Sequence, residues 1–97
     1  MRFVPSRVSE IVDYLSYLVV YYPNDFPSED GVDAGSAVAT LEEGLLKTRA
    51  ALGEVAYGEL LRMSAEAKRL YDQGDRRAGA FMFQDMQALL RRKRTPR

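Results

Sequence analysis

Hydrophobic positions recur at a helical spacing along most of the 97-residue chain. At about 100° per residue, the apolar side chains of residues 8–22 fall on one face, which is typical of an amphipathic helix. We expect Ser6 to cap the start of this helix and Pro23 to end it. The run 18–22 also suits a buried strand, but the helical spacing holds throughout the segment. The face comprises Val8, Ile11, Val12, Leu15, Leu18, Val19 and Tyr22.

A loop and two more helical segments follow. Residues 23–33 hold two prolines, a glycine and four acids without an apolar period, so they predict a loop. Asp30 or Asp33 is expected to cap the next helix. The third segment separates apolar side chains from a ladder of alternating charge. The apolar positions are Ala34, Val38, Leu41, Leu45, Thr48 and Leu52, then Ala56, Leu60, Met63, Ala67 and Leu70; the charged ones are Glu59, Arg62, Glu66 and Arg69.

Gly53 leaves two alternatives open. It either ends the second segment or lies inside one long helix from about residue 33 to residue 73, since the apolar spacing passes through it almost in phase. At about 1.5 Å per residue, the long helix would be too extended for a compact monomer and would imply a dimer.

The last helical segment has clear boundaries. Gly74 suits a helix C-terminus and Asp75 the cap of the next helix, while cations and Pro96 suit its end. Its apolar face comprises Gly79, Met82, Phe83, Met86, Leu89 and Leu90.

The pattern predicts an all-α fold: a small antiparallel bundle of three or four helices that dimerisation would complete. It forms a single domain, 1–97, with an N-terminal arm at 1–5, an acidic loop at 23–33 and a basic tail at 91–97.

Residues 67–83 locally resemble one tetratricopeptide hairpin. The resemblance is carried by Ala67, Leu70, Gly74, Gly79 and Phe83. No second copy occurs at the repeat period of about 34 residues, and such repeats need neighbours to bury a core. We interpret the stretch as a generic helical hairpin.

Composition argues against catalysis. The sequence has no cysteine, histidine or tryptophan, which removes thiolate nucleophiles, imidazole bases and the usual zinc ligands. It also has no phosphate-binding glycine motif. We expect no enzyme activity, no cofactor and no metal. The longest uncharged run, residues 14–24, is shorter than the about 20 apolar residues that a membrane span needs. Without an export signal, we expect a cytoplasmic protein that does not bind membranes.

A second apolar face on the first helix is the main candidate for binding. Tyr14, Tyr17 and Tyr21 lie opposite the aliphatic face, and tyrosine suits interfaces because its ring is buried while its hydroxyl stays wet. Phe81 lies across from the apolar face of the last helix. Either another helix of the same subunit covers the tyrosines, or they contact a partner. We expect a homodimer and an unidentified protein partner.

Charge is divided along the chain although the formal net charge is zero. Residues 1–46 hold two bases and eight acids, a charge of −6, and residues 47–97 hold twelve bases and six acids, a charge of +6. The acidic loop, with Asp25, Glu29 and Asp30, is a secondary candidate for partner contact. Tyr21, Tyr22 and Pro23 before these acids resemble the toxin-facing segment of colicin DNase immunity proteins. That resemblance implies an acidic surface for a basic protein partner.

The basic tail gives the alternative function. Arg91, Arg92, Lys93 and Arg94 would suit weak, non-specific phosphate contacts, although no aromatic side chain among them would stack on bases. The same residues also suit a solvated helix end. The sequence therefore predicts a small non-catalytic protein interaction or regulatory module, with a nucleic-acid-binding accessory protein and an immunity-type binder as alternatives.

Overall fold

The computed structural model describes the backbone of residues 4–94 and the side chains of residues 4–92. Within these residues the chain is all-helical and has no strand, which confirms the all-α part of the predicted fold class. The elements are α1 (Val8–Tyr21), the 3-10 turn η1 (Ser28–Asp30), α2 (Ala34–Lys47), α3 (Arg49–Leu52), α4 (Glu54–Asp72) and α5 (Arg76–Arg94). The described part of the chain thus has four long helices and the one-turn helix α3, where three or four helices were expected.

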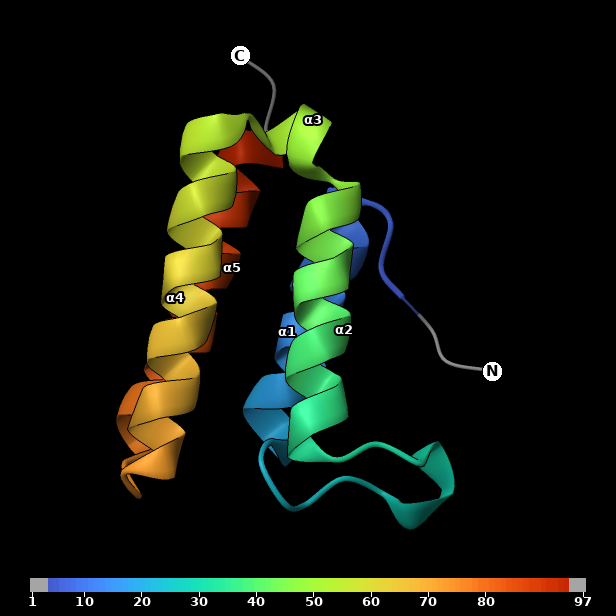
Figure 1. Cartoon of the computed structure of the whole chain (residues 1–97), viewed down its shortest axis with the longest axis vertical. Coiled ribbons are helices and arrows are strands. Elements are labelled where there is room, and N and C mark those ends of the chain that lie inside the picture. The colour runs from blue at the N-terminus through green and yellow to red at the C-terminus, as the bar shows by residue number, and fades with distance from the viewer. Residues whose placement is uncertain (1–3, 95–97) are drawn as a thin grey trace.

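The long helices run in alternating directions along the longest axis (Figure 1). α1 and α2 form one antiparallel pair and α4 and α5 another, and α1 also packs on α5 while α2 packs on α4. The principal extents of 39 × 30 × 18 Å suit two layers of helices. The loop between α1 and α2 lies at one end of the molecule, and the end of α5 lies at the other.

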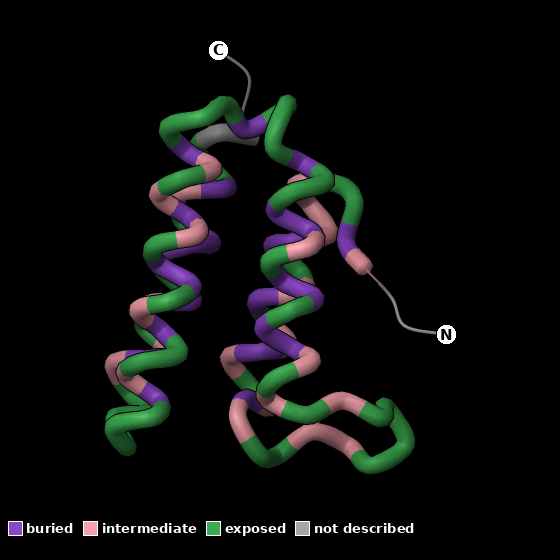
Figure 2. The backbone as a smooth tube through the Cα atoms, in the orientation of Figure 1, coloured by how far each residue is buried: buried purple, intermediate pink, exposed green. Residues whose placement is uncertain are grey.

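The core consists of the faces that helical spacing predicted. Every long helix carries buried positions, whereas loop residues 23–33 are exposed or half-buried (Figure 2). Tyr71 is buried while Leu70, the expected core residue, is only half-buried. The buried apolar residues are Ile11, Val12, Leu15, Leu18, Tyr22, Ala37, Val38, Leu41, Leu45, Leu52, Ala56, Leu60, Met63, Ala67, Tyr71, Phe83, Met86 and Leu90.

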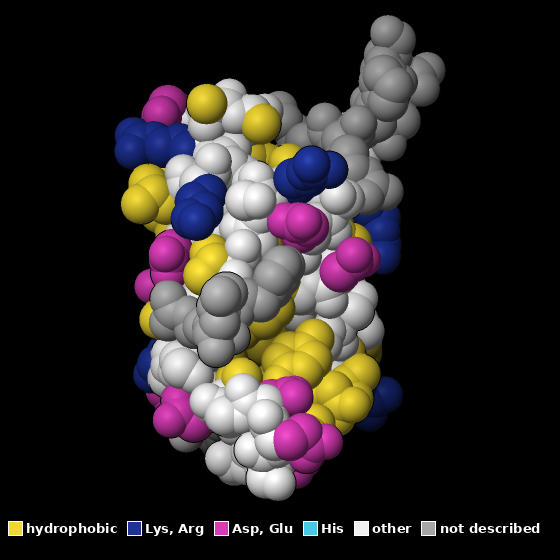
Figure 3. Space-filling view, turned by 90° about the vertical axis from the view of Figure 1, so that its right-hand side faces the viewer, with side chains coloured by type: hydrophobic (Ala, Val, Ile, Leu, Met, Phe, Trp, Pro, Cys, Tyr) yellow, Lys and Arg dark blue, Asp and Glu magenta, His cyan; other side chains and the backbone are white. Residues whose placement is uncertain are grey.

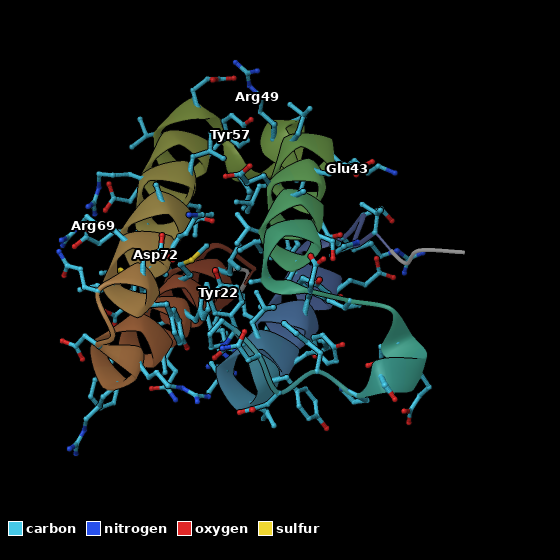
Figure 4. The ribbon with its side chains drawn as sticks, turned by 60° about the horizontal axis from the view of Figure 1, so that its bottom comes forward. Tyr22, Glu43, Arg49, Tyr57, Arg69 and Asp72 are labelled. Atoms are coloured by element: carbon cyan, nitrogen blue, oxygen red, sulfur yellow. The ribbon has the colours of Figure 1, made fainter. Side chains whose placement is uncertain are left out.

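An aromatic cluster joins three helices next to the loop. The Tyr22 ring, just after α1, lies 4.6 Å from the Tyr71 ring of α4 and 5.6 Å from the Phe83 ring of α5, both edge to face. Figure 4 shows Tyr22 between the two helix pairs. A Cβ atom at Gly79 would lie 2.5 Å from the Tyr71 ring, so only glycine lets α5 approach α4 this closely.

Gly53 separates two helices. Its φ of 86° lies outside the helical region, so the single long helix across residues 33–73 is wrong. Arg49 stabilises the resulting corner between α3 and α4: its guanidinium forms an ion pair with Glu54 at 2.8 Å and lies 5.0 Å from the centre of the Tyr57 ring. Arg49 and Tyr57 are seen at this end of the molecule in Figure 4.

The ends of α2 and α4 follow the predicted signals. Asp33 caps α2, because its carboxylate accepts a hydrogen bond from the Ser36 N–H at 2.8 Å while the Ser36 hydroxyl accepts one from the Asp33 N–H. After α4, the N–H of Gly74 donates to Tyr71 and that of Asp75 donates to Leu70, which is a Schellman motif. The Asp75 carboxylate then accepts from the Ala78 N–H at the start of α5, as expected of a cap.

The expected cap at Ser6 is wrong. The cap residue of α1 is Arg7, whose side chain makes no capping bond. Ser6 donates instead: its backbone N–H lies 2.8 Å from a carboxylate oxygen of Glu10, in the first turn of α1. A carboxylate at this position accepts a hydrogen bond from an otherwise unpaired N–H and also interacts favourably with the positive end of the helix dipole.

Within the expected N-terminal arm, Pro5 is buried against Gly44 of α2, and residues 1–3 lie outside the described part.

Two buried polar side chains differ in whether they form hydrogen bonds. Gln87 of α5 donates hydrogen bonds from Nε2 to the Val12 carbonyl oxygen and to the Ser16 hydroxyl of α1, each at 2.8 Å. Ser64 of α4 is fully buried, and its hydroxyl is the buried side-chain group that lacks a hydrogen-bond partner within the described residues. A buried hydroxyl in this state costs about 1–3 kcal/mol.

Replacing the two serines should change stability in opposite directions. Ser64→Ala removes the unpaired hydroxyl, so we expect the free energy of unfolding to rise by about 1 kcal/mol. Ser16→Ala, the matched control, deletes the partner of Gln87 and should lower it by about 0.5–1.5 kcal/mol. Urea unfolding followed by circular dichroism measures both. A Ser64→Ala protein less stable than the parent would contradict this account.

Candidate contact surface

The three predicted tyrosines form one aromatic surface on α1 with a fourth ring from the loop. The Tyr17 ring is central: its centre lies 5.6 Å from that of Tyr14, 5.0 Å from that of Tyr21 and 5.5 Å from that of Phe26. All four side chains are half-buried. We call these residues, Tyr14, Tyr17, Tyr21 and Phe26, the tyrosine surface.

A hydrogen bond ties the loop to this surface. The Tyr17 hydroxyl donates to a carboxylate oxygen of Asp30, in η1, at 2.7 Å. Partial burial raises the pKa of the Tyr17 phenol well above its ordinary value of 10.0, and the bond to the Asp30 carboxylate raises it further. The loop of the same subunit therefore covers part of the tyrosine face, where the sequence left a helix or a partner as the alternatives.

A second anchor holds the start of the loop. The Arg76 guanidinium, at the start of α5, forms an ion pair with Asp25 at 3.0 Å and donates a hydrogen bond to the Tyr22 carbonyl oxygen at 3.3 Å. The last turn of α1 has no basic residue of its own, so Arg76 also offsets the negative end of that helix dipole. The loop is thus fastened at Asp25 by a cation and at Asp30 by a phenol.

Acidic side chains surround the tyrosine surface. On the face formed by α1 and α2, hydrophobic side chains gather near the loop with Asp and Glu side chains beside them (Figure 3). Glu29 and Asp30 are exposed on η1, and Asp13 is exposed on α1 next to Tyr14. Glu10 lies one turn before Tyr14. The structure therefore brings the tyrosines together with acidic loop residues that were predicted as a secondary candidate for partner contact.

The remaining candidate residues lie elsewhere. Phe81 on α5 is 54% exposed, and its ring lies 5.9 Å from the Arg77 guanidinium rather than among the tyrosines. Arg91 and Arg92 are exposed near the end of α5, away from the loop. The side chains of Lys93 and Arg94 lie outside the described part. The expected basic tail begins inside a helix, because α5 continues to Arg94.

Sequence reasoning missed two residues, Phe26 in the tyrosine surface and Arg76 at the anchor of the loop. Phe26 is the aromatic residue of the loop, and its position between two prolines hid any periodic signal. Arg76 lies 51 residues after Asp25, so no local pattern relates them. The charges of α4, in contrast, pair with near neighbours along the ladder of alternating charge that was visible in the sequence. Glu59 pairs with Arg62, and Glu66 with Arg69.

The protein is thus an all-helical chain with an aromatic surface bordered by acidic side chains. Within the described residues, no group of three or more His, Cys, Asp or Glu side chains is placed to hold a metal ion. Among the helices that the structure describes, none has both the length and the apolar character to cross a membrane. Comparisons with protein-family models, curated proteins and solved structures gave no significant match for this chain.

The Tyr17 phenol should make stability depend on alkaline pH. Its folded-state pKa is raised, so its stabilising contribution is complete below about pH 10 and declines as the pH rises toward the folded pKa. Tyr17→Phe should therefore lose less stability than the parent between pH 9 and pH 11, values that bracket the ordinary pKa of tyrosine. Burial also raises the pKa of Tyr22 and Tyr71, so part of the slope remains. Urea unfolding at both pH values measures the difference, and equal slopes would contradict the role of Tyr17.

Proposed function

We propose that the protein is a small non-catalytic interaction module that binds another protein through the tyrosine surface. The observation that carries the proposal is the packing of Tyr14, Tyr17, Tyr21 and Phe26 into one half-buried layer bordered by carboxylates. Aromatic rings held rigid in this way lose little conformational entropy on binding, and tyrosine is common among the residues that dominate interface energies. The absence of histidine and cysteine from the sequence supports a non-catalytic role.

The anchors on either side of the rings support the same proposal. The Tyr17–Asp30 bond and the Arg76–Asp25 ion pair hold the loop in the unbound protein. A surface that is ordered before binding pays a smaller entropic cost when the partner arrives. We also propose a cytoplasmic location, in keeping with a chain that has no cysteine.

Site-specific photo-cross-linking in the source organism tests the tyrosine surface. Tyr14→p-benzoylphenylalanine places the reactive group in the layer of rings, and Gln84→p-benzoylphenylalanine places it on the exposed side of α5. We expect an adduct with a different protein from position 14 and none with a different protein from position 84. Equal adducts with a different protein from both positions, or none from position 14, would reject the tyrosine surface as the binding site.

Self-association is a further part of the proposal. Phe81 on α5 and Val55 on α4 are 54% and 89% exposed, and exposed apolar side chains favour association. A homodimer would give an adduct of twice the chain mass in the same cross-linking experiment. Light scattering at tens of micromolar protein is the control, and a monomer at that concentration would reject the homodimer.

Nucleic-acid binding is the second candidate function. It is favoured by the exposed Arg91 and Arg92 near the end of α5, at the opposite end of the molecule from the acidic loop. We expect retention on heparin at about 50 mM salt that weakens steeply as salt rises and is lost on deletion of residues 91–97. If the full-length protein is not retained on heparin at that salt concentration, this function is eliminated.

A further inference from the structure

The half of the fold that carries the tyrosine surface is uniformly acidic. From the first residue of α1 to Leu46, near the end of α2, the chain has eight acids and no lysine or arginine. The acids are Glu10, Asp13, Asp25, Glu29, Asp30, Asp33, Glu42 and Glu43. This half therefore projects a negative potential toward anything that approaches the rings.

Four cations of the other half form ion pairs with acids of that same half. On α4, Arg62, Lys68 and Arg69 each form an ion pair within three or four residues of their own position. At the α3–α4 corner, Arg49 pairs with Glu54. Arg76 is the cation that the structure places in contact with the acidic loop. These four cations of α3 and α4 therefore pair with acids of their own half and not with the carboxylates around the tyrosine surface.

The Arg76 contact shows which group fits at the border of this surface. One guanidinium nitrogen binds both a carboxylate and the carbonyl oxygen at the end of α1. An incoming guanidinium or ammonium group would meet the carboxylates of Asp13 and Glu29 and the faces of the tyrosine rings, which attract cations through their negative π faces. Aromatic faces beside carboxylates suit a cation better than an anion or an apolar chain.

We infer that the tyrosine surface binds a Lys- or Arg-rich segment of another protein, with the rings of Tyr14 and Tyr21 contacting its cations and the surrounding carboxylates pairing with them. This inference rests on the proposed function and names the chemistry of its partner. Charge complementarity of this kind raises the association rate and makes binding depend on salt.

A decapeptide of alternating arginine and glycine tests the inference. Titrated into the ¹⁵N-labelled full chain at about 50 mM salt, it should shift resonances of residues 13–30 more than those of α4 and α5, and binding should weaken severalfold at about 300 mM salt. A decapeptide of alternating glutamate and glycine should not bind. Binding of both peptides alike, or shifts spread evenly over α4 and α5, would overturn the inference.

Two variants and a matched control separate specific binding from diffuse attraction. Tyr14→Leu keeps an apolar side chain but removes the ring, and should weaken binding of the arginine decapeptide by about two- to fivefold. Asp13→Asn beside the rings should weaken it by about twofold. Asp85→Asn removes the same charge from the exposed side of α5 and should leave the affinity unchanged. Equal losses in Asp13→Asn and Asp85→Asn would overturn the inference.

Failure of the cationic-partner inference can be distinguished from failure of the proposed function. If cross-linking at position 14 captures another protein while the arginine decapeptide produces no shift at residues 13–30, the cationic partner is wrong and the interaction module stands. If position 14 instead cross-links a second copy of this chain and light scattering finds a dimer, the surface is a self-association site and the inference is overturned.

Discussion

The contact of Tyr22 with Tyr71 and Phe83 is the constraint on which the arrangement depends. These rings come from the end of α1, from α4 and from α5, so one cluster joins the two helix pairs. Their close packing requires Gly79, since a side chain there would overlap the Tyr71 ring. Tyr22 holds the end of α1 in the core. The loop that follows then passes over the tyrosine face of α1 before it reaches α2.

That return path produces the candidate surface. The loop places Phe26 against Tyr17 and Tyr21, and it brings Asp30 to the Tyr17 hydroxyl. The second apolar face of α1 is therefore partly covered by the subunit itself and partly available to a partner. Half-buried rings and a fastened loop form a more ordered surface than an exposed row of tyrosines would.

Electrostatics divides the molecule in the same way. The formal net charge of zero is the sum of an acidic half and a basic half. On α4 the charges pair with near neighbours on the same helix, and such exposed pairs add little to stability. Between residues 8 and 46 the chain holds eight acids and no lysine or arginine, so this half of the fold carries a net negative charge.

The sequence alone determined the helices, their inward faces and most of their ends. Apolar spacing, the caps at Asp33 and Asp75 and the glycine at position 74 act within a few residues, so they are readable in a single chain. Tertiary structure decided what depends on distant contacts: the break at Gly53, the burial of Tyr71 against Gly79, and the pairing of Asp25 with Arg76. The tyrosines were recognisable as a second apolar face, but only packing showed that the loop covers part of it, because a loop without period carries no local signal of where it lies.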